Sequence, residues 1–254
     1  MNSSGNYGWG LPVQASTFAP TIDLGIYIIH CAMFVIFILW SSFFTYLLIR
    51  YRKREGVKAE HRHGGVLKSL LPDAIILAFE VGLVVLYAIP TWSKIKMTSP
   101  APEDSQVVEV TGEQFSWSIH YPGPDGKFGR RDPKLINFTN VLGLDPTDLT
   151  AKDDIVTVNE MHIPLGKPTA IALTSKDVIH SFFVPEFRIK QDAVPGMKIS
   201  VWFEPTKEGK FEIACAQLCG FGHSLMHADL YVHSSEQYEQ WLSAQAPALP
   251  LTAK

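Results

Sequence analysis

Four residues that can bind metals lie within one short segment of this chain: two cysteines, one histidine and one methionine. The segment reads Cys215-Ala216-Gln217-Leu218-Cys219-Gly220-Phe221-Gly222-His223-Ser224-Leu225-Met226, with the donors spaced C-x3-C-x3-H-x2-M. Thiolates and imidazoles suit zinc or copper, and a soft thioether, which zinc sites seldom use, favours copper. A second imidazole, His180, lies upstream in Asp177-Val178-Ile179-His180-Ser181-Phe182. These donors exceed what a single copper ion usually binds, whereas two copper ions bridged by the two thiolates would use them all.

Three simpler interpretations of this cluster compete with copper. Cys215 and Cys219 could form a disulfide, because a spacing of four residues on a loop permits the required Cα separation. The two thiols and two imidazoles could instead hold a structural zinc ion, which would leave Met226 without a role. Met226 taken alone could simply fill a hydrophobic core. His180 and the segment that follows it favour copper over these three interpretations.

The arrangement resembles the binuclear copper (CuA) domain of cytochrome c oxidase subunit II. In that family the upstream histidine sits in a D-V-x-H-S segment, as residues 177–181 do here. A family segment K-x-D-A-x-P-G is similar to Lys190-Gln191-Asp192-Ala193-Val194-Pro195-Gly196. The resemblance covers nearly the whole chain and implies a two-helix transmembrane hairpin followed by an all-β, cupredoxin-like Greek-key sandwich.

The resemblance also implies a role for each donor. The two cysteines would bridge two copper ions, and each histidine would bind one of them. The methionine would be a weak axial ligand to one ion, and the main-chain carbonyl of the glutamine would bind the other. The expected metal ligands are therefore His180, Cys215, Gln217, Cys219, His223 and Met226. Asp177 is a candidate to orient an imidazole from outside the metal's own ligand set.

Two departures from the family pattern affect these roles. Many members have Glu where this chain has Gln217, and that carboxylate helps to bind a magnesium ion at the interface with subunit I. An amide is a poorer ligand for a hard dication, so the interface magnesium is doubtful here, whereas the backbone role toward copper is unaffected.

The second departure lies in the aromatic run where electrons from cytochrome c are proposed to enter, which in the family is G-x-Q-W-Y-W. Here it reads Gly112-Glu113-Gln114-Phe115-Ser116-Trp117. Phe115 or Trp117 is therefore expected to receive electrons, unless the route differs. The alternative is that both are core aromatics of a strand, which is the favoured interpretation for Trp117.

Two apolar runs in the N-terminal part predict transmembrane helices, at about residues 22–50 and 70–93. Each is long enough for a hydrocarbon core of about 30 Å, which takes roughly 20 apolar residues. The link between them is basic, and its Lys and Arg residues are Arg50, Arg52, Lys53, Arg54, Lys58, Arg62 and Lys68. Positive loops stay in the cytoplasm. Both termini are therefore expected outside, on the periplasmic face of a bacterial plasma membrane or, as the alternative, in a mitochondrial intermembrane space.

Glu80 interrupts the second apolar run. A carboxylate facing lipid would be costly, so this residue is expected to face protein or water, and it is a candidate for a proton pathway shared with subunit I.

A linker rich in proline and serine, Thr98-Ser99-Pro100-Ala101-Pro102, separates the hairpin from the C-terminal part of the chain, which gives two parts, residues 1–97 and 98–254. Beyond the linker, alternating stretches predict strands at 107–121, 154–163, 169–173, 198–203, 211–214 and 228–232. Turn residues punctuate them, as in an all-β sandwich. A short helix is expected at 235–245.

The resemblance implies subunit II of a haem-copper respiratory oxidase. Such a subunit accepts electrons from a cytochrome c-like donor and passes them to haem in subunit I, where oxygen is reduced to water with proton translocation. This chain has no C-x-x-C-H haem-attachment motif, so it requires an external donor. A nitric oxide reductase subunit would share every copper ligand, a quinol oxidase subunit would lack them, and a copper-delivery module would not need the hairpin. The net charge of −3 gives no indication of nucleic-acid binding.

Overall fold

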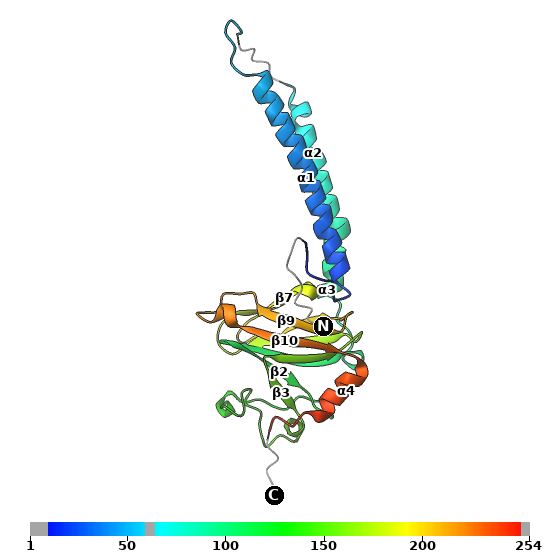
Figure 1. Ribbon diagram of the computed structural model, residues 1–254, viewed down its shortest axis with the longest axis vertical. Coiled ribbons are helices and arrows are strands. Elements are labelled where there is room, and N and C mark those ends of the chain that lie inside the picture. The colour runs from blue at the N-terminus through cyan, green and yellow to red at the C-terminus, as the bar shows by residue number, and fades with distance from the viewer. Residues whose placement is uncertain (1–9, 59–63, 250–254) are drawn as a thin grey trace. The chain divides into compact units, whose positions relative to one another are not determined.

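The chain forms two compact units in the computed structural model, which describes residues 10–58 and 64–249 (Figure 1). One unit is Thr21–Met97, the helical hairpin. The other contains the residues from Thr98 onward and also the N-terminal residues up to Pro20. The chain therefore leaves the second unit, forms the hairpin, and returns to it.

The hairpin consists of two long apolar helical segments. The first is α1 (Ala19–Arg50), with a mean hydropathy of 2.3 over its most apolar 18 residues. The second, with a value of 2.1, runs through α2 (Val66–Leu83), the π-helical turn η1 (Val84–Ala88) and α3 (Ile89–Lys96). At 1.5 Å per residue, each is long enough to cross a hydrocarbon core of about 30 Å. Both predicted helices are confirmed, and of the basic residues in the link, Arg62 lies outside the described residues.

The second unit is a sandwich of two five-stranded sheets. The first sheet has the order β3-β2-β1-β5-β8 and contains β1 (Gln106–Glu113), β2 (Ser116–Tyr121), β3 (Ile155–Val158), β5 (Thr169–Ser175) and β8 (Ile199–Phe203). The second has the order β4-β10-β9-β6-β7 and contains β4 (Glu160–Pro164), β6 (His180–Val184), β7 (Ile189–Ala193), β9 (Gly209–Cys215) and β10 (His227–His233). β1 pairs parallel with β5 and β4 with β10, and the other pairs are antiparallel.

Alternating burial along the strands creates the core between the sheets. In β5 every second residue is buried, as expected for a strand with one face against the core. The largest fully buried side chains are Trp117, Tyr121, Phe182, Phe187 and Phe203. Burying an aromatic or aliphatic side chain of this size contributes about 1.5–3 kcal/mol, so this aromatic core stabilises the sandwich that carries the loops. The predicted fold class is confirmed.

Two of the predicted strands were wrong in extent. Residues 107–121 form β1 and β2 with a tight turn between them, and residues 154–163 form β3 and β4, which are separated at Asn159. Asn159 adopts a left-handed φ of 56°, which a strand cannot continue through, and its side chain accepts a hydrogen bond of 2.8 Å from the backbone N–H of Trp117. β6 and β7 were not predicted.

Short helical segments connect or complete these sheets. The helix expected at 235–245 is confirmed as α4 (Ser235–Ala244), which begins with a capping box between Ser234 and Gln237. The 3-10 turns are η2 (Pro102–Asp104), η3 (Pro133–Leu135), η4 (Leu149–Lys152), η5 (Pro185–Phe187) and η6 (His223–Leu225).

The N-terminal residues just before α1 pack on the sandwich. The backbone N–H of Ala15 donates to the carbonyl of Glu186 at 3.0 Å, and the carbonyl of Ala15 accepts from Thr206 at 2.9 Å. Phe18 is 3% exposed and meets the ring of Trp202 edge-on, with ring centroids 4.6 Å apart. The two parts expected from the sequence, 1–97 and 98–254, place this segment with the hairpin. Its contacts group it instead with the β-domain.

A buried histidine links the first sheet to the long loop of residues 122–153. His120 lies between two carboxylates, with its Nε2 2.7 Å from Asp154 and its Nδ1 3.2 Å from Glu109. Arg131 and Lys198 also contact Glu109, at 2.9 and 2.7 Å. Burial alone would lower the pKa of His120, but the bonds to Asp154 and Glu109 outweigh it and raise that pKa. The surroundings of His120 therefore favour its protonated form.

Candidate metal centre

The second sheet supplies every predicted metal donor. His180 is the first residue of β6, Cys215 is the last residue of β9, and the remaining donors lie in the connection from β9 to β10. Backbone bonds close this connection, since Cys215 N–H donates to the carbonyl of Met226 at 3.1 Å. The N–H of Ala216 donates to Ser181 at 3.0 Å, which ties the loop to β6. Hydrogen bonds therefore close the β9–β10 connection (residues 215–226, the donor loop) and tie its start to β6.

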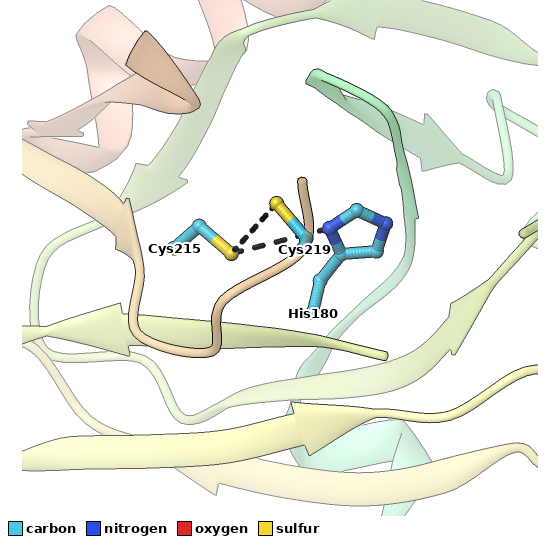
Figure 2. Close-up of side chains that lie close together, drawn as sticks. All are labelled: His180, Cys215 and Cys219. Carbon is cyan, nitrogen blue, oxygen red and sulfur yellow. Dashed lines mark hydrogen bonds between the residues drawn. The ribbon is translucent and has the colours of Figure 1, made fainter. Parts of the chain in front are cut away.

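The donor atoms converge on one small region around the two cysteine sulfurs. Figure 2 shows His180, Cys215 and Cys219, whose ligand atoms all lie within 4.8 Å of one another. Cys215 Sγ is 3.9 Å from Cys219 Sγ and 3.9 Å from His180 Nδ1. Cys219 Sγ is 3.6 Å from His223 Nδ1 and 3.8 Å from Met226 Sδ. The carbonyl oxygen of Gln217 lies 3.3 Å from Cys215 Sγ.

Asp177 determines which nitrogen of His180 faces the sulfurs. Its Oδ1 lies 2.9 Å from His180 Nε2, and His180 is fully buried. A carboxylate accepts a hydrogen bond, so the proton of the neutral ring lies on Nε2 and the lone pair lies on Nδ1. Nδ1 is the atom that points to Cys215. This geometry would suit the imidazole to bind a metal ion through Nδ1.

The charges around the donors depend on their burial. Burial, followed by the neighbouring Cys215, raises the pKa of the Cys219 thiol to about 11, so the metal-free site is protonated there at neutral pH. Burial also acts to raise the pKa of Asp177, but hydrogen bonds from His180 and from the N–H of Gln114 outweigh it and lower that pKa. A metal ion must displace the thiol proton, so binding releases protons to solvent.

The donor set fits copper better than the simpler alternatives. The sulfurs are far beyond the disulfide bond length of about 2.05 Å, and both cysteines are free. A zinc site would be complete with two thiolates and two imidazoles, yet the Met226 thioether also points into the cluster and is 2% exposed. Soft sulfur ligands of this kind suit copper.

The two aromatic candidates for electron transfer differ in their surroundings. Trp117 is fully buried and meets the His180 ring edge-on, with centroids 6.0 Å apart. Phe115 is 36% exposed, and its ring lies against the backbone of Gly222, where an added Cβ would come within 2.4 Å of it. Phe115 thus contacts the donor loop from the surface, whereas Trp117 contacts His180 from the core.

Sequence reasoning missed two neighbours of the donors. Gln114 donates from its side-chain Nε2 to the carbonyl of Cys219, 105 positions away, at 2.7 Å. Gly112 lies against His180, since an added Cβ would be 3.0 Å from the ring Cδ2. Both residues lie in the run that resembles G-x-Q-W-Y-W, but neither residue type signals metal binding, and both are distant in sequence from the donors that they touch. Glu80 is exposed on α2 of the hairpin unit and is not part of the donor cluster.

Comparison with known proteins identifies the family. The family model for the periplasmic domain of cytochrome c oxidase subunit II matches residues 106–232. The alternative cytochrome c oxidase subunit 2 of Bradyrhizobium diazoefficiens is 36% identical over 206 residues, which cover 80% of this chain and 72% of the relative. Cytochrome c oxidase subunit 2 of Cereibacter sphaeroides is 30% identical over 254 residues, covering 92% and 79%.

Among solved structures, the periplasmic domain of subunit II (CoxB) of Bradyrhizobium japonicum is 30% identical and covers 57% of this chain and 95% of that one. The TM-score of this match is 0.42. The family match spans both ligand segments, and the subunit 2 relatives extend over most of the chain's length. The chain therefore belongs to the cytochrome c oxidase subunit II family.

Proposed function

We propose that this chain accepts electrons for a haem-copper oxidase through a binuclear copper centre at the β9–β10 loop. Membership of the family makes it a subunit of a multi-subunit oxidase. The observation that carries the proposal is the convergence of four further donors around the two cysteine sulfurs, which lie 3.9 Å apart. The proposed ligands are His180, Cys215, Gln217 through its carbonyl, Cys219, His223 and Met226. When bound, two copper ions would supply a centre that gains and loses one electron.

The chain's own residues hold the donors in place and bury most of them, whereas His223 is only partly covered. His180 is fully buried, and Cys219 and Met226 are 5% and 2% exposed. Backbone pairing fixes both ends of the donor loop, because Cys215 ends one strand and Met226 immediately precedes the next. A fixed and largely buried site needs little rearrangement when its charge changes, so it favours rapid electron transfer. Asp177 keeps the His180 lone pair directed at the sulfurs.

Electrons are proposed to enter through Phe115 from a cytochrome c-like donor. Phe115 supports this role because it is partly exposed and touches the backbone of the donor loop. Trp117 is a weaker candidate for a surface route because it is fully buried, although it contacts His180. From the copper centre, electrons would pass to haem in subunit I, where oxygen is reduced with proton translocation.

The chain is a membrane-anchored protein with an extracytoplasmic domain, as its two apolar helices and its family indicate. We propose that it resides in a bacterial plasma membrane with the β-domain on the periplasmic face. The basic link between the helices supports this orientation. Glu80 remains a proposed contact to a proton pathway in subunit I. An exposed, uncharged Gln217 side chain gives little support for an interface magnesium ion.

The test is metal analysis of the full-length chain in detergent, loaded with copper and examined by electron paramagnetic resonance. Two copper ions per chain, with one unpaired electron shared equally between both nuclei, are expected. One localised copper ion, preferential zinc binding or a Cys215–Cys219 disulfide would overturn the proposal. In the assembled complex, consumption of oxygen rather than nitric oxide with a reduced cytochrome c separates an oxidase from a nitric oxide reductase.

A further inference from the structure

Gln114 is the point at which the first sheet touches the donor loop of the second sheet. It comes directly after β1, in the turn that leads to β2, and both strands belong to the sheet that supplies no metal donor. Its side-chain amide donates to the carbonyl of Cys219 at 2.7 Å. Because the partner is a carbonyl, the amide nitrogen and not its oxygen must face it.

The backbone of the same residue reaches the second ligand segment. Gln114 N–H donates to Asp177 Oδ2 at 2.8 Å, while Asp177 Oδ1 accepts from His180 Nε2 at 2.9 Å. One residue thus holds the peptide of a bridging cysteine and the carboxylate that orients a histidine. These two ligand segments are about 40 residues apart in sequence and have no covalent connection near the site.

Cys219, like Cys215, lies close to three other donors. Its sulfur approaches three donors, at 3.9 Å for Cys215, 3.6 Å for His223 and 3.8 Å for Met226. The residues after it, Gly220 and Phe221, extend to the surface, and Phe221 is fully exposed. The Gln114 amide therefore restrains a cysteine that is otherwise flanked on its C-terminal side by exposed, glycine-containing backbone.

We propose that the Gln114 side chain is a positioning residue that sets the symmetry of the copper centre by holding the Cys219 peptide. This inference rests on the proposed binuclear copper function. A shift of Cys219 would move its sulfur relative to Cys215, His223 and Met226 together. The two metal positions would then become unequal, because the distances around this sulfur no longer match. Gln114 acts through Cys219 and touches no metal donor atom itself.

Two substitutions isolate the side-chain contact. Gln114→Ala removes the amide and keeps the backbone N–H to Asp177. Gln114→Glu keeps the shape of the side chain but replaces the donor with a carboxylate, which repels the Cys219 carbonyl. Ser116→Ala is the matched control, because Ser116 lies two residues further along, at the start of β2, and its hydroxyl contacts only Glu113 among the described residues, at 3.4 Å.

The full-length variants in detergent are loaded with copper and compared by metal content, electron paramagnetic resonance, reduction potential and loss of copper to a chelator. Both Gln114 variants are expected to bind two copper ions, to lose the equal sharing of the electron, and to release copper about 10- to 100-fold more readily. Ser116→Ala is expected to match the parent. Thermal unfolding of the metal-free variants separates misfolding from mispositioning.

The outcomes distinguish this inference from the function on which it rests. A parent chain that binds no copper pair overturns both. A parent with an equally shared electron and Gln114 variants with the same spectrum, potential and copper release overturns the positioning role alone, whatever their stability. A variant that unfolds early but keeps the parent's spectrum assigns Gln114 a purely structural role and also overturns it.

Discussion

Replacing Asp177 tests how far hydrogen bonding from outside the donor set controls the metal centre. The carboxylate accepts three N–H groups, from His180 at 2.9 Å and Val178 at 2.7 Å on Oδ1, and from Gln114 at 2.8 Å on Oδ2. Asp177→Ala removes the acceptor of all three N–H groups. Asp177→Asn keeps one acceptor oxygen and replaces the other with an NH2 group. That NH2 group must face either the N–H of Gln114 or the N–H groups of Val178 and His180. Both variants leave a donor without an acceptor next to the cluster.

The magnitude depends on the burial of the partners. A hydrogen bond to a charged group contributes about 1.5–3 kcal/mol when both partners are buried. The Asp177 side chain is 32% exposed, so water replaces part of the loss, whereas the His180 ring is fully buried and cannot recover its bond. We expect Asp177→Ala to lower the free energy of unfolding by about 1–2 kcal/mol, since one buried bond is lost and the others are partly replaced. Copper binding should weaken about 10- to 100-fold, because the proton can then move to Nδ1.

The assay is chelator competition for copper by the full-length chain, together with urea unfolding of the metal-free chain. Asp229→Asn is the matched control. Asp229 lies on β10, forms an ion pair with Lys210 at 2.7 Å, and contacts none of the proposed metal donors. Copper affinity of Asp177→Ala within about twofold of the parent would refute the argument that this carboxylate selects the ligand nitrogen, since outer partners of this kind normally cost at least tenfold.

Three further predictions concern other parts of the molecule. Met226→Leu keeps the volume of a side chain that is 2% exposed, so it should cost less than about 1.5 kcal/mol of stability and retain two copper ions, but shift the reduction potential measured by redox titration. The raised pKa of His120 means that its contribution to stability is present below its unfolded value of about 6.5 and is lost as pH rises through the higher folded pKa. Urea unfolding from pH 6 to 9 should therefore show a decline in the parent that His120→Gln lacks, and parallel curves would contradict it. Phe18→Ala, which removes a buried ring packed edge-on against Trp202, should lower the free energy of unfolding by about 3–5 kcal/mol in the same assay, and a change below about 1 kcal/mol would show that the segment is dispensable.

Much of the fold was predictable because it depends on local pattern. Long apolar runs must form helices in a membrane, and alternating residues must form half-buried strands, so the hairpin and most of the strands could be predicted directly. β6 was missed because its residues, His-Ser-Phe-Phe-Val, do not alternate, and four of the five are buried. β7 was missed because Lys190-Gln191-Asp192 reads as polar loop sequence, although it pairs with β6.

The candidate site shows the same division between local and distant information. Donors of unusual chemistry are visible as residue types, and the structure brings the sulfurs and imidazoles close to one another. Gln114 and Gly112 act through where the fold places them rather than through their chemistry, so only the packing of one sheet on the other assigns them a role. The packing of residues 15–18 on the β-domain was equally hidden, since Ser16 contacts a residue 171 positions away.

This last contact has a consequence for how the chain is made. Residues 10–20 are synthesised before both helices and long before the segment around Glu186 and Pro205 that they pair with. They must therefore be exported first and remain unpaired until the β-domain arrives, so closure of that domain is a late event in biogenesis. Once the domain has closed, both ends of the hairpin lead into it. One connection is the linker that begins at Thr98, and the other is the segment before α1, which pairs with the domain through hydrogen bonds. A single proteolytic cut in the linker after Met97 would then leave the domain bound to the membrane.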